Sequence, residues 1–284
     1  MTLRVVEPGL QCLVQDLGRP GWAHLGVSEG GAMDRSALRR ANRLVGNPEQ
    51  AAGLELLLGG TRFIAEDDCL LAVTGAVAEV TVDGRAVDQH RAVMVAAGQE
   101  VTIGRAVAGL RCYLALRGGI EAEAVLGSCS TDPVTGLGPA PVRAGDELVA
   151  GDAGGAVPTA DLAQVHLPSA EVTVRAMLGP RHDWVEPDDL ALLGSLAWRV
   201  SPQCDRIGIR LTGGVLRRRV TDELPSELVV RGAVQLPPSG EPLVFGADHP
   251  TTGGYPVVAV VLDDDIDLLG QVGPGSVVRF DLLR

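Results

Sequence analysis

The sequence has no lysine: all 24 of its basic residues are arginine. This absence excludes a Walker-type phosphate-binding lysine, a lysine Schiff base and a biotinylated lysine from the chain. If ATP or biotin takes part in its function, another chain must supply the lysine or carry the cofactor. We therefore expect no biotin on this chain.

Membrane-spanning runs are also missing, because charged residues interrupt every apolar stretch. The N-terminal residues lack the apolar segment of a signal peptide. The 5 cysteines are scattered without a C-x-x-C pair, and no two histidines have ligand spacing, so we expect neither disulfides nor a bound transition metal. These absences predict a cytoplasmic protein that does not bind a membrane.

Aromatic residues make up only 3% of the 284 residues, so the core must be packed from aliphatic side chains. Hydrophobic residues reach 46% and charged residues 21%, as in ordinary globular proteins. The net charge of -12 repels phosphate backbones, and the one basic cluster, Arg217–Arg219, is soon followed by acidic residues. We expect no nucleic-acid partner.

Short Val-rich runs separated by glycine and proline predict a mainly β fold of the barrel or sandwich type. One hairpin is expected at Val80–Val87, where Asp83-Gly84 tolerates the positive φ of a tight turn. The other expected strands are Ala92–Val95, Glu100–Ile103, Arg111–Leu116, Glu171–Met177, Leu228–Val230, Pro256–Val261 and Ser276–Phe280.

Two helices are predicted as braces on this framework. The first runs from Arg35 to Val45 with Asp34 as its N-cap, and the second runs from Asp188 to Leu196. The acidic run Asp263–Asp267 lacks the spacing of an EF-hand and predicts a solvated turn.

A segment rich in Gly, Ala, Asp and Pro, residues 151–168, predicts a linker. It divides the chain into an N-terminal β lobe, residues 1–150, and a C-terminal β lobe, residues 169–284.

The densest group of polar residues is Ala247–Pro256. Its threonines and tyrosine supply neutral hydrogen-bond donors, its paired glycines let a ligand approach the backbone, and Asp248 or His249 could serve as a general base. We assign Asp248 as the catalytic residue. The predicted substrate-binding residues are Gln235, Thr251, Thr252, Gly253, Gly254, Tyr255, Arg206, Arg19, Ser28 and Asp34.

The two arginines of this set each have an alternative interpretation. Arg19 could clamp a carboxylate or phosphate, or it could pair with Asp16 inside its own turn. Asp205 and Arg206 point to opposite faces of an extended segment and would not pair with each other, which leaves one of them for a ligand or partner chain.

The loop Ser28–Met33 leads into the first predicted helix. Its glycines expose backbone N–H groups and the helix dipole favours an anion, although a simple helix start capped by Asp34 fits equally well. Gly26–Gly30 also matches the G-x-S-x-G nucleophile elbow, but no strand precedes Ser28, so we interpret this match as chance.

Six short sequence motifs, given at the end of this paragraph, occur together and in the same order in one known family. Because it has these motifs, the chain resembles allophanate hydrolase subunit 2, a family also described as the C subunit of 5-oxoprolinase. It is similar, too, to the carboxyltransferase region of urea carboxylase and to the antagonist of a sporulation-kinase inhibitor. It departs from the usual pattern at Leu228, often glycine, and at His249-Pro250, commonly Arg-Gln. The motifs are Gln15–Arg19, Gly26–Asp34, Ala41–Asn47, Leu126–Asp132, Asp205–Leu211 and Thr251–Pro256.

The resemblance implies cyclophilin-like β-barrel lobes and part of an ATP-dependent 5-oxoprolinase that opens the lactam of 5-oxo-L-proline to L-glutamate. It also implies two partners, the B subunit (a homologue of allophanate hydrolase subunit 1) and the A subunit. ATP would be a co-substrate shared with a partner, and the chain alone would be inactive. The alternatives are a carboxyltransferase subunit of a biotin-dependent urea or allophanate system, and a regulatory protein that binds a kinase-inhibitor homologue.

Overall fold

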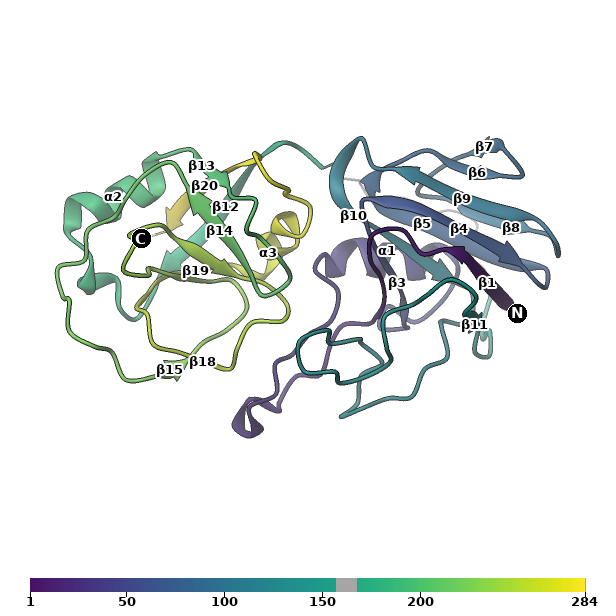
Figure 1. Cartoon of the computed structure of the whole chain (residues 1–284), viewed down its shortest axis with the longest axis horizontal. Helices are drawn as coiled ribbons and strands as arrows, with labels where there is room; N and C mark the ends of the chain where they lie inside the picture. The colour runs from purple at the N-terminus through teal and green to yellow at the C-terminus, as the bar shows by residue number, and fades with distance from the viewer. Residues whose placement is uncertain (157–167, 284) are drawn as a thin grey trace. The chain divides into compact units, whose positions relative to one another are not determined.

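The computed structural model describes residues 1–156 and 168–283 and divides into two compact units (Figure 1). Unit 1 comprises Met1–Arg19 and Gly30–Pro168, and unit 2 comprises Pro20–Glu29 and Ser169–Arg284. The segment Pro20–Glu29 therefore belongs with the C-terminal half, which differs from the contiguous lobes predicted from the sequence. Most of the predicted linker, residues 157–167, lies outside the described residues.

Unit 1 is built on two antiparallel sheets that share an aliphatic core. Phe63 lies in that core among leucines, valines and alanines, as the composition requires. The first sheet has the order β11 (Glu147–Val149), β1 (Thr2–Glu7), β4 (Gly59–Ala65), β9 (Glu100–Arg105), β6 (Val80–Val82) and β7 (Arg85–Val87). The second has the order β2 (Cys12–Gln15), β3 (Gly53–Leu57), β10 (Ala108–Leu116), β5 (Cys69–Val77) and β8 (Ala92–Val95).

The predicted hairpin and first helix are both confirmed in unit 1. β6 pairs with β7 across Asp83 and Gly84, whose φ values are 47° and 73°. Helix α1 (Arg35–Leu44) begins after Asp34, whose carboxylate accepts a hydrogen bond of 2.8 Å from the Ala37 N–H. Its buried alanine and leucine side chains pack against residues of β5 and β10.

Unit 2 is a closed seven-stranded barrel (Figure 1). A separate two-stranded sheet joins β15 (Glu227–Leu228) to β18 (Thr252–Gly253). Trp198 is fully buried in the barrel core among valines, leucines and isoleucines. The barrel order is β12 (Glu171–Leu178), β19 (Val257–Val261), β16 (Ala233–Gln235), β17 (Leu243–Phe245), β14 (Gly208–Thr212), β13 (Trp198–Val200) and β20 (Val277–Leu283). A mainly β fold is thus confirmed, and of the two units the second is the closed barrel.

The helices of unit 2 confirm one prediction and correct another. α2 (Pro187–Ser195) matches the second predicted helix. The acidic run forms helix α3 (Asp263–Leu269), so the prediction of a solvated turn was wrong. Three aspartates in its first turn complement the helix dipole, and Ile266 and Leu269 are buried in the barrel core. Two short 3-10 helices, η1 (Ala23–Leu25) and η2 (His182–Trp184), complete the unit.

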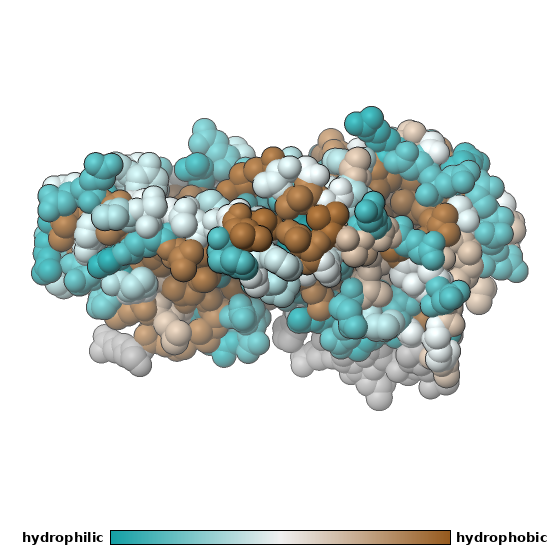
Figure 2. Space-filling view, turned by 90° about the horizontal axis from the view of Figure 1, so that it is seen from below, coloured by the Kyte–Doolittle hydropathy of each residue, from teal (hydrophilic) through white to brown (hydrophobic). Residues whose placement is uncertain are grey.

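The face shown in Figure 2 carries both hydrophilic and hydrophobic residues. No helix in the described part of the chain is both long and apolar enough to cross a membrane.

Candidate functional site

The polar loop singled out in the sequence connects β17 to β19 in unit 2 and passes through β18. Its path is fixed by the Gln235 amide, which donates a hydrogen bond of 2.9 Å to the Tyr255 carbonyl. The Val229 N–H donates to the Thr251 carbonyl at 3.1 Å. A Cβ at Gly253 would lie 2.5 Å from Gln235 Nε2, so a larger residue here would displace the Gln235 amide. The structure therefore brings Gln235, Gly253 and Tyr255 together, as predicted for one site.

Asp248 and Arg206, which the sequence placed in the same site, form a buried bidentate ion pair. Arg206 Nε and Nη2 donate to the two carboxylate oxygens at 2.7 and 2.9 Å, and the Asp248 N–H donates to the Arg206 carbonyl at 3.0 Å. The Arg206 and Asp248 side chains are 5% and 0% exposed. Such pairing holds the carboxylate in a fixed orientation. The role of Asp248 as a catalytic base stays a prediction.

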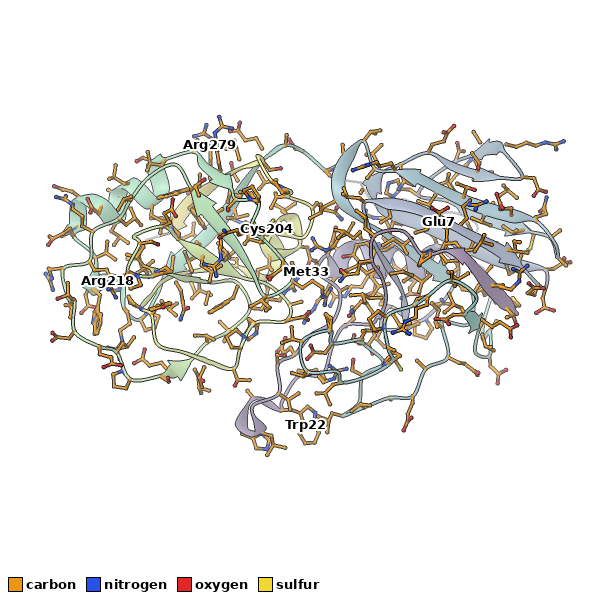
Figure 3. All side chains as sticks on the ribbon, viewed as in Figure 1. Glu7, Trp22, Met33, Cys204, Arg218 and Arg279 are labelled. Atoms are coloured by element: carbon orange, nitrogen blue, oxygen red, sulfur yellow. The ribbon has the colours of Figure 1, made fainter. Side chains whose placement is uncertain are left out.

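Asp205 lies next to Arg206 but points elsewhere, as expected from the sequence. Its carboxylate accepts hydrogen bonds from the Ile207 and Gly208 N–H groups at 2.8 and 3.0 Å, which closes the turn before β14. Cys204, at the start of this turn, is labelled in Figure 3. The turn directs the Arg206 side chain toward Asp248 rather than toward the adjacent Asp205.

His249 follows Asp248 and is also buried, with 5% of its surface exposed. Its Nδ1 lies 2.7 Å from the Pro250 carbonyl oxygen, and its ring centroid lies 6.0 Å from that of Phe245. Burial lowers the pKa of His249 below its ordinary value of 6.5, and the charge of Arg231 lowers it further. The Pro250 carbonyl and the charges of Glu29 and Asp248 act in the opposite direction. On balance the pKa is lowered, which favours the neutral imidazole.

More charged groups gather around this histidine than the sequence suggested. Arg231 Nη2 donates to Asp267 at 3.0 Å, and both side chains are nearly buried. Glu29 comes from the Pro20–Glu29 segment, whose Trp22 is labelled in Figure 3. The sequence analysis assigned none of these three residues to the site. Asp267 was missed because it lay in a run interpreted as a solvated turn. The sequence signal that could have found Asp267 is the i, i+3 spacing of Ile266 and Leu269, which predicts a packed helix.

The outer side of the loop carries the neutral donors. Thr252 and Tyr255 are exposed and Thr251 is half-buried. Below them, Glu227 of β15 forms a bidentate ion pair with Arg181, whose guanidinium also lies 5.9 Å from the centroid of the Trp184 ring. The loop thus places neutral hydroxyl groups and peptide groups beside a buried charged cluster.

In unit 1, Arg19 does not pair with Asp16, so that interpretation was wrong. Arg19 is 1% exposed, and its guanidinium donates to the carbonyl oxygens of Val125 and Ser130. The Asp16 carboxylate accepts from the backbone N–H of Gly18 and from residues 128–130. Both side chains therefore fix the path of the loop 125–130, and the role of Arg19 in substrate binding stays a prediction.

The two remaining predicted residues, Ser28 and Asp34, lie in different units. Ser28 is nearly buried and follows η1 and Gly26 rather than a strand, which confirms that the G-x-S-x-G match is not a nucleophile elbow. Asp34 caps α1 in unit 1, and its N–H donates to the Tyr113 hydroxyl at 2.8 Å. A part for either residue in ligand binding stays a prediction.

Comparison with known proteins gives a consistent family. The model of the carboxyltransferase domain, subdomain A and B, matches residues 25–282. The C subunit of 5-oxoprolinase from Escherichia coli is 37% identical over 98% of this chain and 90% of its own length, and that from Haemophilus influenzae is 35% identical over the same shares. The chain belongs to this carboxyltransferase-domain family.

Members of the family occur within much longer proteins. Urea amidolyase of Saccharomyces cerevisiae is 30% identical over 98% of this chain but only 16% of its own length. The crystal structure of TTHA0988 has a TM-score of 0.90 and 35% identity, and the match covers 99% of this chain and 55% of that one. The K. lactis urea amidolyase structure also has a TM-score of 0.90, with 26% identity over 100% of this chain and 19% of that one. In these relatives the carboxyltransferase-domain region is covalently joined to further chain.

For this family member, the described residues suit the binding of a small polar molecule. The exposed hydroxyl groups of Thr252 and Tyr255 can donate to a carbonyl, and Gly253-Gly254 leaves the backbone accessible. The buried arginines Arg206 and Arg231 are ion-paired with Asp248 and Asp267, and the neutral imidazole of His249 supplies a nitrogen acceptor. A cyclic or primary amide matches this set of groups.

Proposed function

We propose that the chain is the C subunit of a 5-oxoprolinase, which opens the lactam of 5-oxo-L-proline to L-glutamate. The observation that carries the proposal is its 37% identity to the Escherichia coli protein of that name over nearly the whole of this chain and 90% of the other. The neutral hydroxyl donors of the loop Ala247–Pro256, which could bind an amide, support the proposal.

The proposed reaction begins with phosphorylation of the lactam carbonyl oxygen by ATP, because an amide carbon is a poor electrophile. Addition of water to that carbon, with cleavage of the C–N bond and a proton passed to the ring nitrogen, gives the free amine and an acyl phosphate. A second water then hydrolyses the acyl phosphate to the carboxylate of glutamate and free phosphate. The hydroxyl donors of Thr251, Thr252 and Tyr255 would orient the substrate, and Arg206 would hold the Asp248 carboxylate in position beside it. Asp248 remains our candidate for the base.

We further propose that ATP is bound with the help of partner subunits and that the chain is inactive alone. The sequence has no lysine and no nucleotide-binding motif, so the usual cationic contacts to the phosphates must come partly from elsewhere. The partners we propose are the B and A subunits of the same enzyme. The occurrence of the homologous region inside longer chains supports association with further protein.

A second function is favoured by the family model itself, whose description is a carboxyltransferase domain, and by the urea amidolyase relatives at 30% identity. In this case the chain would transfer a carboxyl group between biotin, carried by another protein, and a small amide such as urea. The loop donors would then bind the amide of urea in place of the lactam.

One experiment separates the two functions. The chain is co-expressed with the products of neighbouring genes, and the purified complex is assayed for ATP hydrolysis with 5-oxo-L-proline and with urea. Hydrolysis that depends on 5-oxo-L-proline and forms glutamate supports the first function. Hydrolysis that depends on urea, bicarbonate and biotin overturns it in favour of the second.

A further inference from the structure

We propose that His249 determines substrate specificity by accepting a hydrogen bond from a substrate N–H at its Nε2 atom. The inference rests on the proposed function, since it places the amide end of the substrate beside this histidine. It assigns to His249 a role that neither Asp248 nor the hydroxyl donors of the loop can fill.

The tautomer of His249 follows from its hydrogen bond to Pro250. A carbonyl oxygen can only accept, so the Nδ1 atom 2.7 Å away must carry the proton. In the neutral ring Nε2 then holds a lone pair and acts as an acceptor. Within the part of the chain that the structure describes, Nε2 makes no hydrogen bond.

The surroundings of the ring keep it neutral near pH 7. Phe245 of β17 covers the ring, and Arg231, which precedes β16, adds a positive charge. Glu29 from the Pro20–Glu29 segment and Asp248 from the same loop oppose this with negative charge, but burial is the largest effect and the pKa of His249 is lowered. An imidazole with a lowered pKa remains an acceptor at neutral pH.

The other side chains near His249 do not offer an equivalent neutral acceptor. Asp248 is charged and ion-paired with Arg206, and Arg231 has donors only. A substrate N–H that reaches Nε2 would therefore find an uncharged acceptor among side chains that are otherwise charged. Lactams and ureas carry such an N–H, whereas the corresponding lactone has an oxygen at that place.

The test compares 5-oxo-L-proline with its lactone analogue, in which oxygen replaces the ring N–H, on the assembled complex. The lactone is measured as an inhibitor of ATP hydrolysis driven by 5-oxo-L-proline. We expect it to bind roughly 10- to 100-fold more weakly than the lactam, because Nε2 and the lactone ring oxygen, both acceptors, would face each other. His249→Phe keeps an aromatic ring but has no acceptor nitrogen, so it should raise the KM for the lactam and remove most of this discrimination. His249→Gln keeps an acceptor oxygen and should restore part of it.

Two measurements keep the result interpretable. His182→Gln is the matched control, because His182 has the same Nδ1 contact to a backbone carbonyl, at 2.8 Å from Gly179, but lies in η2. Melting temperatures of all variants report on folding. A His249→Phe complex with unchanged KM and unchanged preference for lactam over lactone would overturn the inference.

A failure of the proposed function is recognised separately. If the wild-type complex shows no hydrolysis driven by 5-oxo-L-proline, the proposed function is wrong. The inference is then tested with urea by ¹⁵N spectra of the histidine rings, in which His249→Gln identifies the His249 signals. A urea-dependent shift of the Nε2 signal supports the acceptor role, and its absence for both urea and 5-oxo-L-proline refutes it.

Discussion

Replacement of Asp16 by asparagine tests whether the carboxylate of this residue holds the loop 125–130 in place. Asp16 is only 8% exposed and directly follows strand β2. Its Oδ1 accepts hydrogen bonds from the hydroxyls of Ser128 and Ser130, both at 2.6 Å, and from the Gly18 N–H at 2.7 Å. Its Oδ2 accepts from the Cys129 N–H at 2.7 Å.

An asparagine cannot satisfy these four donors. With its oxygen at the Oδ1 position, its NH₂ group faces the Cys129 N–H, and with the amide reversed it faces three donors. Loss of one buried bond to a charged acceptor, with a donor left unsatisfied, costs about 2–4 kcal/mol. For a unit of this size that corresponds to a decrease in melting temperature of roughly 4–16 °C. Unit 1 should therefore unfold earlier in Asp16→Asn.

The assay is thermal and urea unfolding of the isolated chain followed by circular dichroism. Asp88→Asn is the matched control, since Asp88 pairs with Arg91 on the surface with 72% of its side chain exposed, and such a pair contributes little. If Asp16→Asn unfolds within about 0.5 kcal/mol of the wild type, the carboxylate is not an important anchor of the loop, and the reasoning from its four donors is refuted.

Three further predictions concern activity. The isolated chain should show no ATP hydrolysis driven by 5-oxo-L-proline and should gain it when the proposed partners are added; robust turnover by the single chain would contradict this. Asp248→Asn in the complex should lower turnover on the order of 10²–10⁴-fold if this residue is the base, and near-normal turnover would leave it a structural role with Arg206. Because the pKa of His249 is lowered, its neutral acceptor is present above that pKa and lost as the pH falls through it, below the ordinary 6.5. The KM for 5-oxo-L-proline should therefore rise in acid for the wild type and stay level for His249→Gln.

Local patterns in the sequence predicted several elements of the fold. Asp34 before an amphipathic run predicted α1, and Asp83-Gly84 between Val-rich runs predicted the β6–β7 hairpin, because both features depend on neighbours within a few residues. The sequence gives no local signal for the placement of Pro20–Glu29 in unit 2, since this depends on contacts with residues more than a hundred positions away. Helix α3 was missed because its acidic residues suggested solvent, whereas Asp265 is held by Arg175.

In the candidate site, too, contacts between residues far apart in the sequence could not be predicted from local patterns. Gln235 and the loop Ala247–Pro256 were grouped from their residue types, and the hydrogen bond from Gln235 to Tyr255 does bring them together. Which ionised groups pair with each other could not be read from spacing, because Arg206 and Asp248 are separated by 42 positions. Pairing of this kind is decided by the barrel, which sets β14 beside β17 and so brings the segments before β14 and after β17 together.

Four ion pairs of unit 2 show a structural use of arginine that lysine could not replace. Each arginine of the four pairs named below uses Nε and one Nη atom to donate to both oxygens of one carboxylate. A planar guanidinium fits this arrangement, whereas a lysine ammonium is a point charge on a flexible stem and loses its proton more readily when buried. Replacing Arg206 by lysine would therefore keep the formal charge but lose the two-point contact that orients Asp248. At these four positions of unit 2 arginine thus has a structural role, independent of the cofactor chemistry that the absence of lysine excludes. The four pairs are Arg175–Asp265, Arg181–Glu227, Arg206–Asp248 and Arg217–Asp189.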